Sequence, residues 1–324
     1  MRIAIPLAAV ATALACSLAT APAHARARVF VASYGNDANP CTFGSPCKTF
    51  QQAVTVVDAG GEVTAIDSAG FGPINITKSV SITSPDGVEA GIVPVSGGNA
   101  ITINAGPSDA IVLRGLTLDG TSGGFNGVVF NSGGSLTVTN CVAQNFPFFG
   151  GNFFTSGNGI AILPTAGTVK FAITNTTVSN NGIAGILYAA LAGTPSVTGV
   201  IDHVSATANN NGISINGSAG GSQLQEVAIS NSTASNNGAG IQLVTGGTEI
   251  VSIDNVTVTG NSEIGIQAAA TNVVALLSRS VIQGNSIGIW NETSNTFYTY
   301  GNNLIDLNVQ NFQFNPLNST VKLR

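Results

Sequence analysis

Few residues of this 324-residue sequence could carry acid–base chemistry, because only 8% of them are charged. Arg114, Asp202 and Asp254 occupy equivalent positions of a repeated segment, and Ser230 takes that position between the two aspartates. If successive repeats stack as neighbouring strands, the aspartates lie about 10 Å apart, which is too far to share one cation. We therefore expect solvated charges on a polar face.

Metal and phosphate chemistry have equally little support in the sequence. His203 is the only histidine outside the N-terminal leader, so no cluster of imidazole ligands is available. No glycine-rich phosphate loop follows a strand into a helix. We expect no catalytic residue set, no metal site and no cofactor; Ca²⁺ is chemically possible, but no residue pattern supports it.

Three residues at one repeat position have the chemistry to bind a sugar. Trp290, the only tryptophan, shares this position with Gln267 and Gln242, so an exposed indole would stand beside two amides. Such a set suits stacking on a sugar ring and hydrogen bonding to its hydroxyls. The alternative is that the C-terminal tail shields Trp290.

The segment NFPFFGGNFF, residues 145–154, is unusually apolar for a loop. It either folds back over the side of the structure or forms an exposed contact patch for a ligand or partner. Under the second alternative, Phe148, Phe149 and Phe153 are candidate ligand-binding residues, and oligomerisation through 146–154 is possible.

A repeat of about 25 residues must position all these side chains. The phrase SNNGAGIQL (235–243) has counterparts whose glycines recur every 23 to 32 residues. A second anchor, usually asparagine, precedes each phrase. The glycines are Gly127, Gly159, Gly185, Gly212, Gly240, Gly265 and Gly288; the second anchors are Gly115, Asn140, Asn175, His203, Asn231, Asn255 and Arg279.

Apolar and polar columns alternate with period two around both anchors, which is typical of strands with one buried face. Two residues before the second anchor, Ile173, Ile201, Ile229 and Ile253 are expected to stack inside. In the repeated phrase, isoleucines are expected to point inward and their successors outward. The outward column comprises Val129, Ala161, Leu187, Ser214, Gln242, Gln267 and Trp290.

Columns that match in parallel predict an all-β fold, a single-stranded right-handed parallel β-helix (a solenoid) with a short N-terminal capping helix. Asparagine tolerates the left-handed backbone of a tight corner, and stacked asparagines can hydrogen-bond along a ladder. The phrase NNG would form the next corner in the same way. The repeated phrase is therefore interpreted as a corner followed by a strand.

The chain divides into three parts. Residues 1–25 have an apolar run after Arg2 and an Ala-His-Ala end, which predict a signal peptide and a secreted protein, extracellular or periplasmic. Residues 26–70 form the predicted N-terminal cap: a strand, a cysteine loop, a helix with a Thr49-x-x-Gln52 capping box, and a first strand. Residues 71–324 supply the coils and a closing tail.

Cysteine content and charge limit the partners. Export would permit a disulfide, and Cys41 and Cys47 can close a small loop, whereas Cys141 is expected to be a buried thiol. Without the leader, 9 basic residues face 15 acidic ones, which disfavours nucleic acid as a partner. No apolar run after the leader is long enough to predict a transmembrane span.

The opening RVFVASYGNDANPCTFGSPCKTFQQAV, followed by AGGEVTAID, resembles that of secreted right-handed parallel β-helix proteins of the pectate-lyase-like superfamily. The shared features are a G-x-D-x-N-P loop (Gly35, Asp37, Asn39, Pro40) and a helix start at Pro46, Thr49 and Phe50. The resemblance implies the fold over the whole chain after the leader. The superfamily holds lyases, hydrolases, epimerases and adhesins, so it does not fix the activity.

In enzymes of the resembled group, the active groove follows the outer face of one strand column, which corresponds here to the repeated phrase. A lyase needs a base and a cation beside a uronate, and a hydrolase needs paired carboxylates. No residue of the outward column meets either need. The sequence favours a non-catalytic protein that binds a polysaccharide or cell-surface glycan. The alternatives are a polysaccharide lyase-like enzyme with a non-standard site and a structural or adhesive spike.

Overall fold

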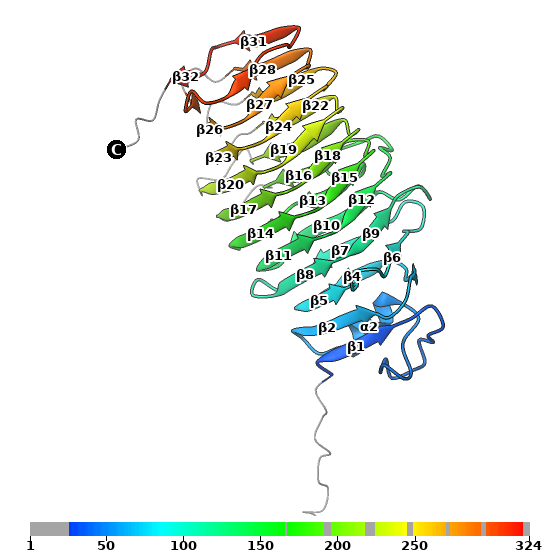
Figure 1. Ribbon diagram of the computed structural model, residues 1–324. Helices are drawn as coiled ribbons and strands as arrows, with labels where there is room; N and C mark the ends of the chain where they lie inside the picture. The colour runs from blue at the N-terminus through cyan, green and yellow to red at the C-terminus, as the bar shows by residue number, and fades with distance from the viewer. Residues whose placement is uncertain are drawn as a thin grey trace, which may run out of the picture.

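The computed structural model describes residues 26–165, 167–190, 196–217, 224–244, 249–269, 273–292 and 296–319. Their strands run through three parallel sheets in rotation, so that each coil adds one strand to each sheet (Figure 1). We number the sheets in the order in which the chain visits them. The predicted parallel β-helix is confirmed. The predicted signal peptide, residues 1–25, lies outside the described residues.

Sheet 1 has twelve strands and runs the length of the stack. Its strands are β1 (Arg28–Val31), β2 (Gly61–Ala65), β5 (Val80–Thr83), β8 (Ala110–Arg114), β11 (Ser135–Thr139), β14 (Val169–Thr174), β17 (Val197–Asp202), β20 (Gln225–Ser230), β23 (Glu249–Asp254), β26 (Val273–Ser278), β29 (Phe297–Thr299) and β32 (Asn318–Ser319).

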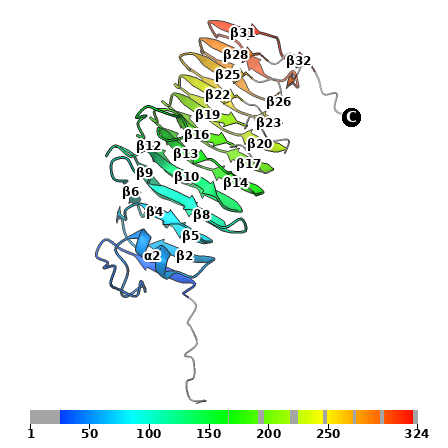
Figure 2. The same ribbon diagram turned by 180° about the vertical axis from the view of Figure 1, so that it is seen from behind.

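Sheets 2 and 3 have ten strands each (Figure 2). Sheet 2 comprises β3 (Ala69–Gly70), β6 (Ala90–Ile92), β9 (Leu116–Asp119), β12 (Val142–Gln144), β15 (Thr177–Ser179), β18 (Ser205–Thr207), β21 (Thr233–Ser235), β24 (Thr257–Thr259), β27 (Val281–Gln283) and β30 (Leu304–Ile305). Sheet 3 comprises β4 (Ile74–Ile76), β7 (Ile101–Asn104), β10 (Asn126–Ser132), β13 (Asn158–Ile162), β16 (Ala184–Ala189), β19 (Asn211–Asn216), β22 (Ala239–Leu243), β25 (Ile264–Ala268), β28 (Ile287–Asn291) and β31 (Gln310–Phe314).

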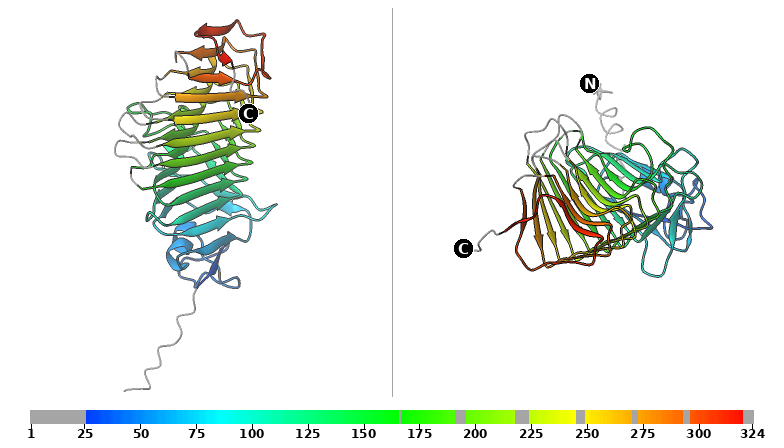
Figure 3. Two further views of the ribbon diagram at one scale, coloured as in Figure 1. Left: turned by 90° about the vertical axis from the view of Figure 1, so that its left-hand side faces the viewer. Right: turned by 90° about the horizontal axis from the view of Figure 1, so that it is seen from above.

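The three sheets wind around a common interior (Figure 3). Aliphatic columns fill this interior, as the alternation predicts. Ile173, Ile201, Ile229 and Ile253 pair directly in sheet 1 and are fully buried. Gly199 interrupts a neighbouring inward column because a β-carbon there would collide with the ring of Phe171 on the preceding coil. One large side chain thus fills the space of two positions, which keeps the core close-packed.

The corner between sheets 1 and 2 has the predicted left-handed backbone. Asn140, Asn175, His203, Asn231 and Asn255 have φ between 48° and 54°. Asparagine is tolerated there because its short side chain can bond locally, and Asn255 Nδ2 donates to Asn231 Oδ1 at 2.7 Å. This exposed ladder fixes the corner of successive coils.

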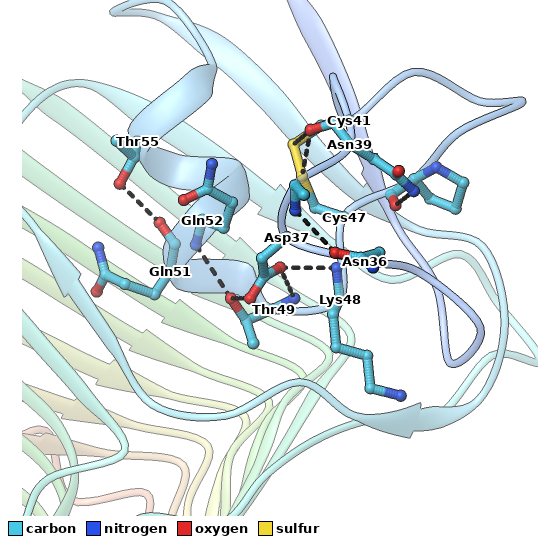
Figure 4. The surroundings of a disulfide bond; sticks show 12 residues. Asn36, Asp37, Asn39, Cys41, Cys47, Lys48, Thr49, Gln51, Gln52 and Thr55 are labelled. Atoms are coloured by element: carbon cyan, nitrogen blue, oxygen red, sulfur yellow. Dashed lines mark hydrogen bonds between the residues drawn. A yellow bond between two sulfur atoms is a disulfide. The ribbon is translucent and has the colours of Figure 1, made fainter.

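Helix α2 (Phe50–Val56) closes the N-terminal end, with Phe50, Ala53 and Val54 buried against the first coil. Thr49 is its N-cap and accepts a hydrogen bond from the Gln52 N–H at 3.2 Å (Figure 4). Asp37 Oδ1 accepts from the backbone N–H of Lys48 at 2.8 Å and of Thr49 at 2.9 Å. The carboxylate therefore fastens the preceding loop to the helix start.

A disulfide joins Cys41 and Cys47, whose Cα atoms lie 4.6 Å apart beside this helix. Replacing both cysteines with alanine is expected to lower the free energy of unfolding by about 2 kcal/mol, because the crosslink closes only a small loop. Thermal unfolding followed by circular dichroism, with and without reductant, measures the loss. The double mutant should have the same stability with and without reductant, whereas reductant should lower the stability of the wild type.

At the C-terminal end the predicted closing tail contains the strands β31 and β32, and residues 320–324 lie outside the described part. Strands β1 and β2 of the predicted 26–70 cap are continuous with sheet 1, so cap and coils share one sheet. In the described segments, no helix has the length and apolarity needed to cross a membrane.

Candidate binding groove on sheet 3

The outward column of sheet 3 has the predicted register. Ala161 pairs with Leu187, Leu187 with Ser214, and Ser214 with Gln242. Gln242 then pairs with Gln267, and Gln267 with Trp290. The repeat therefore lines these side chains up along one outer face of the stack.

Four members of this column, Val129, Ala161, Leu187 and Ser214, are buried, although the alternation alone predicts an outer surface. Val129, Ala161 and Leu187 are 6%, 0% and 3% exposed and belong to a second apolar cluster outside the coil. Phe154 packs against this cluster. The phenylalanine-rich segment therefore folds back over the first half of sheet 3, which is one of the two alternatives raised by its sequence.

Beyond this covered region the outer face of sheet 3 forms a groove of about 250 Å³. Phe153, Phe154, Ile183 and Leu187 supply its apolar side. Ala239 and Ile264 add two further apolar side chains. The polar lining comprises Ser214, Gln242, Gln267, Asn210, Asn211 and Asn216, together with Glu263. We call this site the amide groove.

The polar residues of the amide groove form a chain across three coils. Ser214 Oγ donates to Gln242 Oε1 at 3.3 Å, and Gln242 Nε2 donates to Gln267 Oε1 at 2.8 Å. Both glutamines are half-buried, and these bonds hold their side chains in place against the sheet. Because every bond in this chain points the same way, the Gln267 amide nitrogen at its end still has N–H groups to offer a ligand.

The predicted ligand-binding residues divide into two groups. Gln242, Gln267 and Phe153 line the amide groove. Trp290 lies outside its lining: the indole packs against Phe314 with ring centroids 5.0 Å apart, and Nε1 donates to Glu292 at 2.8 Å. The C-terminal strand β31 thus shields Trp290, which is the second of the two alternatives given for this residue.

Phe148 and Phe149 also lie outside the groove lining, although both are exposed, at 38% and 54%. The ring of Phe148 packs on Phe153 at 6.1 Å, and that of Phe149 packs on Phe125 at 5.5 Å. Phe148 therefore supports the ring of Phe153, whereas Phe149 packs on Phe125. Oligomerisation through 146–154 stays a prediction.

The charged residues on the other faces form local structural contacts. Asp202 accepts hydrogen bonds from Ser230 and Asn231 and lies 2.6 Å from His203 Nδ1; these contacts lower the pKa of its carboxyl to about 2. Asp254 pairs with Arg279. Across the described ranges, no three His, Cys, Asp or Glu side chains are grouped as metal ligands.

The Cys141 thiol lies in the core. Burial raises its pKa to about 11, so it is expected to be inert.

The interior holds a polar group that the sequence analysis missed. Gln225 and Glu249 pair directly in an inward column of sheet 1, between Val197 and Val273. Both are fully buried, and Tyr188 donates its hydroxyl to Gln225 Oε1 at 2.8 Å. Neither Glu249 carboxylate oxygen has a hydrogen-bond partner among the described residues. Burial raises the pKa of Glu249 to about 8, and the backbone of Gly217 offsets only part of the rise.

Comparisons with known proteins relate the fold to a solved enzyme. No protein-family model matches the chain, and no curated protein matches it in sequence. The crystal structure of pectate lyase Pel9A superimposes with a TM-score of 0.60 and 17% identity, covering 91% of this chain and 77% of the lyase. The chain shares the pectate-lyase fold. A rhamnogalacturonan lyase aligns with a TM-score of 0.45 and 11% identity over 91% of this chain and 89% of its own.

Proposed function

We propose that this protein is a secreted, non-catalytic binding protein that holds a polysaccharide or cell-surface glycan in the amide groove. The observation that carries the proposal is the Ser214–Gln242–Gln267 chain beside an exposed phenylalanine. Amides offer donors and acceptors to sugar hydroxyls, and the ring of Phe153 offers a face for the apolar side of a sugar.

The residues in the groove argue against turnover. β-Elimination needs a base to remove a proton and a cation to neutralise the uronate carboxylate, and no Lys, Arg or His is among the described residues that line the groove. Hydrolysis needs two carboxyl groups across the bond, and Glu263 is the only carboxylate that the described part of the chain places in the lining. The likeness to pectate lyase Pel9A, at 17% identity, concerns the fold alone.

The disulfide supports the secreted location in this proposal. Structural disulfides persist in oxidising compartments and are rare in the cytosol. The Cys41–Cys47 bond is buried in the cap, where it holds the loop against α2. A glycan on a cell surface or in the medium is a partner that a secreted solenoid can reach.

Gln242→Ala and Phe153→Ala are each expected to weaken retention on an immobilised glycan about tenfold, because each removes one direct contact with the sugar. Affinity electrophoresis through a panel of plant, algal and bacterial polysaccharides measures this. Gln283→Ala, a glutamine on β27 of sheet 2, removes the same side chain from another face and should retain wild-type mobility.

The same panel discriminates the enzymatic alternative. A lyase would release unsaturated uronates, which absorb in the ultraviolet, from an acidic polysaccharide. Sustained release by wild type, abolished by a groove substitution, would contradict non-catalytic binding. If every groove variant were retained as strongly as the wild type, the ligand would have to bind on another face.

A further inference from the structure

We infer that the amide groove selects neutral polysaccharides and rejects polyuronates; this rests on the groove being the glycan site proposed above. The deciding feature is the charge of sheet 3. Its ten strands, from β4 to β31, contain not one Asp, Glu, Lys or Arg.

Sheet 1 shows that the repeat accepts charged side chains. Its strands carry Arg28, Glu62, Arg114, Lys170 and Glu226, among others. The strands of sheet 2 carry one charged residue, Asp119. All three sheets share the same repeat and the same core, so the solenoid itself does not require a neutral outer face. Sheet 3 combines its lack of charge with the amide groove.

The one charge at the groove has the wrong sign for a uronate. Glu263 is exposed in the corner before β25 and lines the groove beside Gln267. No cation among the lining residues offsets it. A chain of uronates would bring one carboxylate per sugar into this field, with only amides to replace the water it loses, and burying unpaired charge is costly.

Neutral sugars fit the same surface without that cost. Their hydroxyls both donate and accept, which matches amides that present carbonyl oxygens and N–H groups side by side. The two amides stand on neighbouring coils at the spacing of about 4.8 Å, so an extended chain along the stack meets Gln242 and then Gln267.

Affinity electrophoresis of the full chain through β-glucan, xylan, galactomannan and polygalacturonate, at low and high salt, tests the inference. Wild type is expected to be retarded by at least one neutral polymer, independently of salt, and not by polygalacturonate. Salt-sensitive retardation by polygalacturonate alone would overturn neutral selection while leaving the glycan site in place. No retardation by any polymer would overturn the site as well.

A charge reversal places the selection in the groove. Glu263→Lys is expected to gain affinity for polygalacturonate about tenfold at low salt, because the repulsive charge becomes attractive. Glu226→Lys makes the same net change on the exposed outer face of β20 in sheet 1 and should gain nothing. Equal gains in the two variants would show that net charge, and not the groove, governs selection; thermal melts confirm that both are folded.

Discussion

Glu249→Gln is expected to raise the free energy of unfolding by roughly 5 kcal/mol above pH 8, while changing it little below pH 4.5. The reason is that the carboxyl group of Glu249 is buried in the core column, between Gln225 on the preceding coil and Val273 on the next. An ionised carboxylate there is withdrawn from solvent, and the backbone of Gly217 compensates only in part, so charging it is costly. Glutamine has nearly the same shape and never ionises.

The pH dependence follows from the direction of the pKa shift. Burial raises the folded-state pKa of Glu249 to about 8, from an ordinary value of 4.5. Between these two values the unfolded chain releases the proton and the folded chain keeps it, so stability falls as the pH rises through this window. Below pH 4.5 both states are protonated, and the stabilising contribution is complete. Asp202, whose pKa is lowered to about 2, contributes in the opposite direction and only at more acidic pH.

Chemical unfolding at half-unit intervals from pH 4 to pH 9 measures the effect. The wild-type midpoint should decline across the window, and the Glu249→Gln profile should be flat there. Glu226→Gln removes an exposed carboxylate from the neighbouring strand and serves as the matched control. If the variant at Glu249 and this control gave the same profile, the buried carboxyl would not be the titrating group.

The coil architecture is fully encoded in local patterns, which is why the sequence predicts it. The Ile173–Ile201–Ile229–Ile253 column needs only period two and a common anchor, and the anchor itself needs only a residue that tolerates positive φ. Both are nearest-neighbour properties of a repeat, and the stability of a solenoid is approximately a sum of such terms. The structure confirms both.

The groove is not encoded in that way. The repeat places Gln242 and Gln267 on one outer face, but the groove also needs a wall, and Phe153 and Phe154 come from a single insertion. Nothing in the period indicates that this insertion covers Leu187 yet leaves Gln242 open. The length and direction of a loop depend on contacts across coils, which a column of sequence does not contain.

The interior polar pair has a sequence signal, although a subtle one. Six residues before the second anchor, the inward column reads Val169, Val197, Gln225, Glu249 and Val273. Period two therefore predicts that Gln225 and Glu249 point inward. Extending the columns by one further inward position would have found them.

A second asparagine ladder, buried at the corner between sheets 2 and 3, is expected to dominate stability. It is formed by one asparagine from each repeated phrase. Its members are Asn181, Asn209, Asn237, Asn261 and Asn285. From Asn209 onward, each side-chain oxygen accepts a hydrogen bond from the backbone N–H of the preceding coil's asparagine, and Asn181 accepts from that of Phe146. Each side chain also donates to a carbonyl of sheet 2, as when Asn237 Nδ2 donates to Ala206 O at 3.1 Å.

Asn237→Ala is accordingly expected to lower the free energy of unfolding by about 4 kcal/mol. The change removes the acceptor of the Asn209 N–H, at 2.9 Å, and leaves that buried N–H without this partner. It also removes the donor to Ala206 O and the side-chain bonds to Asn209 and Asn261. Urea unfolding measured by circular dichroism gives the difference.

Asn231→Gly is the matched control, because it deletes an asparagine of the exposed ladder where φ is 48° and glycine is tolerated. Its side chain bonds Asp202 and Asn255 at the surface, where water can replace it, so a loss below about 1 kcal/mol is expected. Equal losses in the two variants would mean that burial of the ladder is irrelevant.

The buried ladder also explains the glycine of the repeated phrase, because a β-carbon on Gly212 would lie 2.9 Å from Asn237 Nδ2. Glycine and asparagine therefore recur together because the ladder needs the space that the glycine leaves.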